Sequence, residues 1–301
     1  MSLPDGITRL LAPNPSPMTL TGTNTYLVRG ADGCAIIDPG PRIEEHLQTV
    51  AEEARSQGGA RAILITHGHP DHVEGAARLR ELTGARIVAW SRAGVPEADE
   101  TLPDGGMLSL GRRGLRAHFT PGHRFDHLCF ALEGERATGA IFAGDLVAGA
   151  GTVVIAPPEG DLLDYLASLR RVLALNPRLL LPGHGPERED ARALLGGYLA
   201  HREERERQLV SALRGEPASV AALVEAIYTD TPSYLHPVAA HSTLAGLLKL
   251  EREGRVTRTS AEDGAAQTVR FDAPGPLALE GMVGRPDGLF SLWSRVSEAQ
   301  P

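Results

Sequence analysis

The sequence has little cysteine and no long apolar run. Its two cysteines, Cys34 and Cys129, each lie within an apolar segment, so we expect no disulfide framework and a reducing compartment. No stretch approaches the roughly 18 to 20 apolar residues that span a bilayer, and the N-terminus lacks the pattern of a signal peptide. These absences predict a cytoplasmic protein that does not insert into a membrane.

An excess of positive charge is also absent. The formal net charge is −8, and Lys249 is the only lysine among the 30 lysine and arginine residues. This balance argues against a protein held on nucleic acid by its overall charge. The chain has 301 residues, of which 42% are hydrophobic, so it is long enough for one large domain or two ordinary ones with substantial cores.

Strand and helix signals alternate through the first two-thirds of the chain. Short apolar runs bounded by turn residues predict strands, whereas apolar residues three and four apart predict helices. We expect strands at 25–30, 34–40, 61–66, 86–90, 115–119, 127–132, 140–143 and 178–182, and helices at 42–57, 73–82 and 161–175. Such a mixture favours sheets with helices packed outside them.

The pattern changes after residue 185. A charge-rich helix is expected over 187–214, followed by a helix capped by Ser219 and another that is capped by Ser242 and ends at Gly254. Strands at 255–259 and 267–271 then flank a turn. Because helix, helix and hairpin is the order of a winged helix, we predict a first domain over 1–200. A winged-helix-like domain with its tail would occupy 201–301.

One short segment, THGHPDH at residues 66–72, is dense in metal-ligating side chains. His67 and His69 are two residues apart in an extended stretch, so their side chains can project to the same side. Asp71 and His72 would begin a helix after Pro70, which suits a strand-to-helix corner. Imidazole and carboxylate groups together suit zinc, and also iron or manganese.

Three later turns supply further candidate ligands. His123 ends HFTPGH, Asp145 ends AIFAGD, and His184 follows LLLPG. Each comes after an apolar, strand-like run and a glycine, where the backbone can approach a metal closely. We therefore expect all of these side chains at the carboxyl ends of strands.

The motif HxHxDH with a later His, Asp and His resembles that of the metallo-β-lactamase superfamily. The resemblance implies an α+β fold, an αββα sandwich with a dinuclear metal site along one edge. It also implies which side chains bind each ion: His67, His69 and His123 the first, Asp71, His72 and His184 the second, and Asp145 both.

Flanking segments resemble the beta-lactamase-like protein 2 group. They are NPSPMTLTGTNTYLV (14–28), GDLVAGAGT (144–152), PGHGP (182–186), YLAHREERERQ (198–208) and HSTLAGLLKLEREGRV (241–256). Members of this group append a winged helix to the hydrolase domain, and its animal members are endoribonucleases on single-stranded RNA. The resemblance implies that domain 1–200 is the catalytic domain and that it binds two divalent ions, with zinc as the first candidate. The two ions would hold a bridging hydroxide. Asp71 would orient this hydroxide and accept its proton.

The sequence leaves the substrate open between two classes. Single-stranded RNA is favoured by the subgroup, but residues 241–272 carry five basic and five acidic groups, so no basic face stands out unless Arg255, Arg258 and Arg270 gather in space. A small-molecule or carrier-bound thioester is the alternative, because TPGHRFDHLCF resembles the glyoxalase II pattern. A redox enzyme, a β-lactamase or a non-catalytic binding protein fits less well. Homodimerisation stays open.

A few polar residues have two readings each. Asp38, after AIID, either orients a ligand histidine or caps the turn that follows it, and we favour the first. We read His127 as a core histidine, and His236 and His241 as solvated turn residues rather than substrate contacts. Asn24 and Thr25 lie on a hairpin that either borders the site or only stabilises its own turn. The loop at 148–160 either shapes the substrate entrance or connects two elements.

Overall fold

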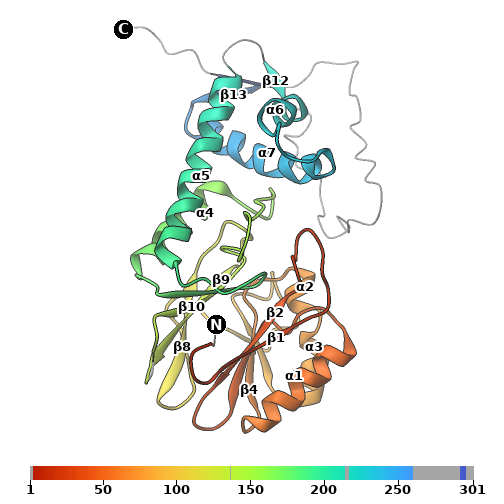
Figure 1. Ribbon diagram of the computed structural model, residues 1–301, viewed down its shortest axis with the longest axis vertical. Coiled ribbons are helices and arrows are strands. Elements are labelled where there is room, and N and C mark those ends of the chain that lie inside the picture. Colours follow the sequence, from red (N-terminus) through yellow and green to blue (C-terminus); the bar gives the residue numbers. More distant parts are fainter. Residues whose placement is uncertain (1–2, 136, 214–216, 260–291, 296–301) are drawn as a thin grey trace. The chain divides into compact units, whose positions relative to one another are not determined.

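The computed structural model describes residues 3–135, 137–213, 217–259 and 292–295 (Figure 1). The chain forms two compact units. The first comprises Met1–Val153 and Asp164–Tyr198, and the second comprises Val154–Leu163 and Leu199–Pro301. The segment 154–163 thus belongs with the C-terminal unit.

The first unit begins with a six-stranded sheet in the order β1-β2-β3-β4-β5-β6. Its strands are β1 (Ile7–Leu11), β2 (Asn24–Arg29), β3 (Cys34–Ile37), β4 (Ala60–Leu64), β5 (Arg86–Ala89) and β6 (Glu100–Thr101). The first three strands pair antiparallel, whereas β3 to β6 pair parallel. Helices α1 (Glu44–Ser56), α2 (Pro70–Val73) and α3 (Ala76–Thr83) interrupt this run of strands.

A second sheet has the order β11-β10-β9-β8-β7. Its strands are β7 (Met107–Ser109), β8 (Arg113–Phe119), β9 (Leu128–Gly134), β10 (Ala140–Gly144) and β11 (Leu179–Pro182). Only β10 and β11 pair parallel. Helices α4 (Leu162–Ala174) and α5 (Ala191–Ala212) come before and after β11.

Successive side chains along a strand point to opposite faces of the sheet and so contribute to two hydrophobic cores. In β2, Tyr26 and Val28 face the second sheet and join a cluster that includes Phe130 and Phe142. Leu27 points the other way, into a cluster shared with α1 and α3. Because both faces of the sheet are buried at its centre, β3 is apolar throughout and β4 and β5 are largely apolar. The result is helices outside two stacked sheets, which confirms the αββα sandwich (Figure 1).

Strand direction brings distant segments to one edge of the sandwich. Parallel β3 and β4 end on the same side of the first sheet. In the second sheet, β8, β10 and β11 also run in one direction, because β9 is antiparallel to both β8 and β10. A bridge between Thr23 and His184 joins the two sheets there. The loops after these strands therefore converge.

The predicted helix at 73–82 is two helices. α2 ends at Val73, and α3 starts at Ala76. The N–H of Gly75 donates to Gly40 O at 2.9 Å, and a Cβ on Gly75 would lie 2.6 Å from Leu47 Cδ2. This close approach of another loop breaks the helix. Strands β1, β6 and β7 were not predicted.

The second unit has the winged-helix order. After α5 come β12 (Ala218–Ser219), α6 (Val220–Ile227), a short 3₁₀ helix (Ser233–Leu235), α7 (His236–Arg252), β13 (Val256–Thr259) and β14 (Leu292–Arg295). The strands form a sheet in the order β12-β14-β13. The hydrophobic core of this unit includes Leu209, Leu223, Leu244, Leu247 and Val256.

The predicted helix caps have different outcomes. Ser219 Oγ accepts a hydrogen bond from Ala222 N at 3.2 Å, so this cap is confirmed. The Ser242 cap is wrong, because α7 already begins at His236 with Pro237 in its first turn. His241 therefore lies inside a helix and not in a turn.

The strand predicted at 267–271 lies outside the described residues. In the part of the chain that the structure describes, β13 pairs antiparallel with β14. No helix among these described residues is long and apolar enough to cross a membrane.

Candidate metal centre

The seven predicted ligands come together at the shared sheet edge. They form two groups of potential ligand atoms that lie within 4.8 Å of one another in each group. The groups are His67, His69, His123 and Asp145, and Asp71, His72 and His184. Up to 117 residues separate these positions in the chain, since His67 and His184 are the outermost. Only the fold makes them neighbours.

In the first group, three imidazole nitrogens converge on one point. His67 Nε2 lies 2.9 Å from His69 Nδ1, and His123 Nε2 lies 3.0 Å from the same atom. Two nitrogens that bind one tetrahedral zinc ion at ordinary bond lengths are about 3.3 Å apart. The spacing therefore fits a common ion after a small expansion.

The second group has the same character. His72 Nε2 lies 3.2 Å from His184 Nε2, and Asp71 Oδ2 lies 3.2 Å from His184 Nε2. Asp145 lies between the groups. Its Oδ2 is 3.6 Å from His123 Nε2 and 3.5 Å from His184 Nε2, and its Oδ1 is 3.5 Å from His72 Nε2. One carboxylate thus faces both groups.

A buried network behind the site fixes two imidazole tautomers. Asp38 Oδ2 accepts hydrogen bonds from Thr66 Oγ1 at 2.7 Å and from His72 Nδ1 at 2.8 Å. Because the Thr66 proton goes to Asp38, its oxygen accepts from His67 Nδ1 at 2.9 Å. Both histidines then turn Nε2 toward the centre. The favoured reading of Asp38 agrees with this geometry.

Two glycines make room for the centre. A Cβ on Gly183 would lie 2.6 Å from His72 Cε1 and 2.7 Å from Asp145 Oδ1. Gly144 has φ 48°, and a Cβ there would lie 2.7 Å from His127 Nε2. The expected close approach at glycines is therefore present beside Asp145 and His184.

Burial and mutual charge shift the titration of the site. Burial raises the pKa of Asp71, but positive charge on His72 and His184 outweighs it and lowers the pKa to about 2. Burial lowers the pKa of His72, yet Asp145, Asp71 and Asp38 raise it to about 9. Burial also lowers the pKa of His184, but the negative charge of Asp145 and Asp71 raises it to about 11. These two imidazoles thus hold protons where a cation would lie.

The donor set fits divalent metal ions. Imidazole nitrogens and carboxylate oxygens suit such ions, and here these atoms converge in two groups. Neither cysteine is suited to act as a thiolate nucleophile, because burial raises the pKa of Cys34 to about 11 and that of Cys129 to about 12. Neither thiol is ionised near neutral pH.

The sequence did not predict the residues that support the loop at 67–69, which carries two of the proposed ligands. Asp126 Oδ2 accepts from Gly68 N at 3.1 Å and from Arg124 at 2.8 Å, and Asp126 is buried. His127 Nε2 accepts from Asp145 N at 3.0 Å, while its Nδ1 bonds with Thr120 Oγ1. The sequence feature that could have pointed to them is the segment HRFDH (123–127), which places a carboxylate two residues after an arginine beside the candidate ligand His123.

Two hairpin residues bond with segments on either side of the site, Asn24 near His184 and Thr25 at Asp38. Asn24 Nδ2 donates to Pro182 O at 2.9 Å and to Gly185 O at 2.8 Å. Thr25 Oγ1 donates to Asp38 O at 2.7 Å. Both residues border the site and do more than stabilise their own turn.

The described wing arginines do not form an open basic cluster. Arg255 pairs with Glu206 and Glu253, and Arg258 lies 3.4 Å from Glu251. Arg270 lies outside the described residues. In the second unit, His236 Nε2 bonds with Thr231 O at 3.1 Å, which is a local turn contact.

Known families and structures resemble the whole arrangement. Residues 18–184 match the metallo-beta-lactamase superfamily, and residues 219–265 match the beta-lactamase associated winged helix domain. The Beta-lactamase-like protein 2 homolog of Drosophila melanogaster is 31% identical over 282 residues, covering 87% of this chain and 93% of that protein. The Atrochrysone carboxyl ACP thioesterase of Aspergillus fumigatus is 33% identical over 246 residues, covering 75% of each.

A solved structure agrees. The crystal structure of a metallo-beta-lactamase family protein from Thermus thermophilus matches with a TM-score of 0.70 at 25% identity, covering 85% of this chain and 96% of that one. The superfamily match covers more than half of the chain, and the match to the Drosophila protein covers most of it. Both place the chain in the same family. This chain belongs to the metallo-beta-lactamase superfamily, which includes hydrolases, in the group with a winged helix that contains the beta-lactamase-like protein 2 homologs.

Proposed function

We propose that this protein is a dinuclear metal-dependent hydrolase. The observation that carries the proposal is the pair of ligand groups that share Asp145. His67, His69 and His123 would hold one ion, Asp71, His72 and His184 the other, and zinc is the first candidate. Two divalent ions held there would lower the pKa of water and polarise the scissile group.

The chain's own residues position this chemistry. Asp71 is ionised at neutral pH, and its side chain keeps 29% exposure, so it can accept a hydrogen bond from a water and orient it. Asp38 and Thr66 fix the orientation of His72 and His67. No serine or cysteine nucleophile is needed.

Single-stranded RNA is our first candidate substrate, and hydrolysis of its phosphodiester bonds the reaction. Support comes from the winged helix and from the relative that matches over nearly its full length. A carrier-bound or small acyl thioester is the second candidate. It is favoured by the thioesterase relative and by the ion-paired wing arginines.

The test compares both substrates on one preparation. Protein loaded with two zinc ions is assayed on a labelled single-stranded RNA and on an acyl thioester whose free thiol is titrated, with Asp71→Ala as the control. RNA cleavage that disappears in the variant supports the nuclease proposal.

Other outcomes separate the candidates. Thioester hydrolysis without RNA cleavage supports the second candidate. If wild-type protein that holds both metal ions is inactive on both substrates, the hydrolase proposal fails for these substrate classes.

A further inference from the structure

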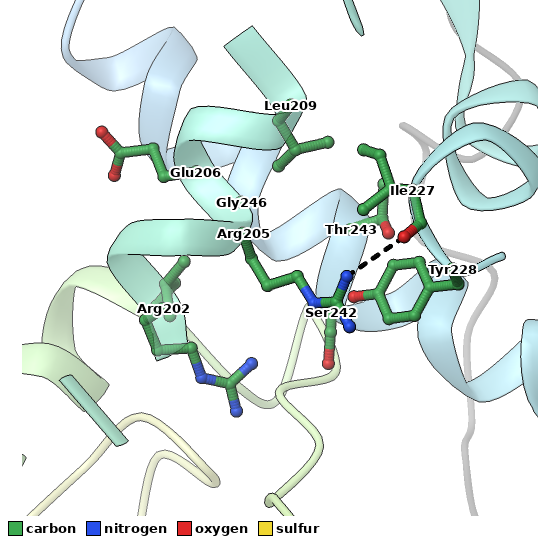
Figure 2. A pocket seen from close by; sticks show the side chains of 10 residues that line it. Arg202, Arg205, Glu206, Leu209, Ile227, Tyr228, Ser242, Thr243 and Gly246 are labelled. Atoms are coloured by element: carbon green, nitrogen blue, oxygen red, sulfur yellow. Dashed lines mark hydrogen bonds between the residues drawn. The ribbon is translucent and has the colours of Figure 1, made fainter. Parts of the chain in front are cut away.

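A small pocket in the second unit has no role in the proposed hydrolysis. It contains about 360 Å³ of empty space, part of it open to solvent. The residues that line it come from α5, α6, α7 and their borders, with Leu162 from the start of α4 (Figure 2). Arg202 and Arg205 line it, as do the hydroxyl side chains of Tyr228, Ser242 and Thr243. The lining is therefore rich in hydrogen-bond donors.

The positive charge of Arg205 is not balanced by a carboxylate. Its Nη1 donates to Gln208 Oε1 at 2.9 Å and to Ile227 O at 3.2 Å, and its guanidinium lies 4.1 Å from the centre of the Tyr228 ring. Among the residues that the structure describes, no acidic side chain forms an ion pair with Arg205. Its buried Nε has no hydrogen-bond partner there either.

The acidic residue in the lining is already engaged. Glu206 accepts from Lys249 Nζ at 2.6 Å and also pairs with Arg255. The pKa of His201 is lowered by burial, and the charges of Arg202 and Arg205 lower it further. The positive charges of both arginines thus act on this part of α5.

An unpartnered hydroxyl provides independent evidence for a ligand. Thr243 is 2% exposed, lines the pocket, and its Oγ1 has no hydrogen-bond partner among the described residues. A buried polar group without a partner is costly. Ser242 Oγ accepts from Ile155 N at 3.4 Å, which leaves its proton free to donate.

We propose that this pocket is an oxyanion site that binds a phosphate group. The Arg205 guanidinium and the hydroxyls of Ser242 and Thr243 offer hydrogen-bond donors that the oxygens of a tetrahedral phosphate can use. Figure 2 shows the Arg205 side chain extending toward Tyr228 and Ser242. The site is separate from the metal centre and does not depend on the proposed hydrolysis.

The first experiment measures binding of inorganic phosphate to the metal-loaded full chain by calorimetry. Arg205→Gln removes the unbalanced charge, and Thr243→Val replaces the hydroxyl with a methyl group of similar size without leaving a cavity. We expect each to weaken phosphate binding by about tenfold or more. Arg207→Gln is the matched control, since Arg207 lies on the same helix but is 73% exposed and pairs with Glu204.

The outcomes separate this site from the metal centre. Phosphate held at the metal centre would be lost on chelation and would be insensitive to Arg205→Gln. No saturable binding, or binding that neither Arg205→Gln nor Thr243→Val weakens, overturns the proposal. Thr243→Val also guards against misfolding, because removing a buried, unpartnered hydroxyl should not destabilise the fold.

A competition arm identifies the source of the phosphate group. A short single-stranded oligoribonucleotide and phosphopantetheine are each titrated against bound phosphate. Displacement by the oligonucleotide alone assigns the pocket to a nucleic-acid phosphate. Displacement by phosphopantetheine alone assigns it to a carrier arm, and resistance to both leaves free phosphate as the ligand.

Discussion

His72 Nδ1 lies 2.8 Å from Asp38 Oδ2, and both side chains are almost fully buried. This contact spans 34 residues of sequence and turns His72 Nε2 toward the second ligand group. The same carboxylate oxygen also bonds with Thr66, which orients His67. One side chain therefore orients a histidine in each ligand group.

We expect Asp38→Asn to lower metal affinity by about 10- to 100-fold while preserving the fold, because it removes the charge that supports two ligand histidines. Competition with a chromophoric chelator measures the affinity. Asp32→Asn is the control, since Asp32 is exposed. Equal affinities for the two variants would contradict the role given to Asp38.

Asp145 faces both ligand groups, so Asp145→Ala should reduce the occupancy of both ions. His123→Ala should affect chiefly the first, because His123 belongs to that group and its Nε2 lies 3.0 Å from His69 Nδ1. Metal per chain after dialysis, measured by mass spectrometry, checks this. Loss of a single ion in Asp145→Ala would argue against a shared carboxylate.

Gly183→Ala should disrupt the centre through steric conflict. The added Cβ would lie 2.6 Å from His72 Cε1 and 2.7 Å from Asp145 Oδ1, closer than real Cβ contacts. We expect a large loss of metal content and of hydrolysis. Gly196→Ala is the comparison, because nothing lies within 4 Å of its Cβ. It lies within α5, so alanine should stabilise the helix by about 0.5 to 1 kcal/mol.

Metal binding should release protons at pH 7. The pKa values of His72 and His184 are raised to about 9 and about 11 before metal binds, so both imidazoles carry protons that a metal must displace. Affinity should therefore fall as the pH falls. Calorimetry in two buffers of different ionisation enthalpy measures the release, which we expect to be about two protons per chain. Identical heats in both buffers would show that no net proton leaves.

The sequence by itself determined the candidate ligand set and most of the local structure. The spacing of His67, His69, Asp71 and His72 depends only on a strand-to-helix corner, which neighbouring residues encode. Apolar periodicity likewise located most strands and helices, and Ser219 marked a helix start because capping is a local hydrogen bond.

The tertiary structure decided what depends on contacts between distant segments. His72 and His184 meet across 112 residues, and Asp126 supports Gly68 across 58. Glu206 neutralises Arg255 across 49, so the described part of the wing shows no basic cluster of the kind its composition left open. Ser242 looked like a helix cap, yet Pro237 started the helix earlier. Local patterns carry no information on such pairings, because strand direction and packing set them.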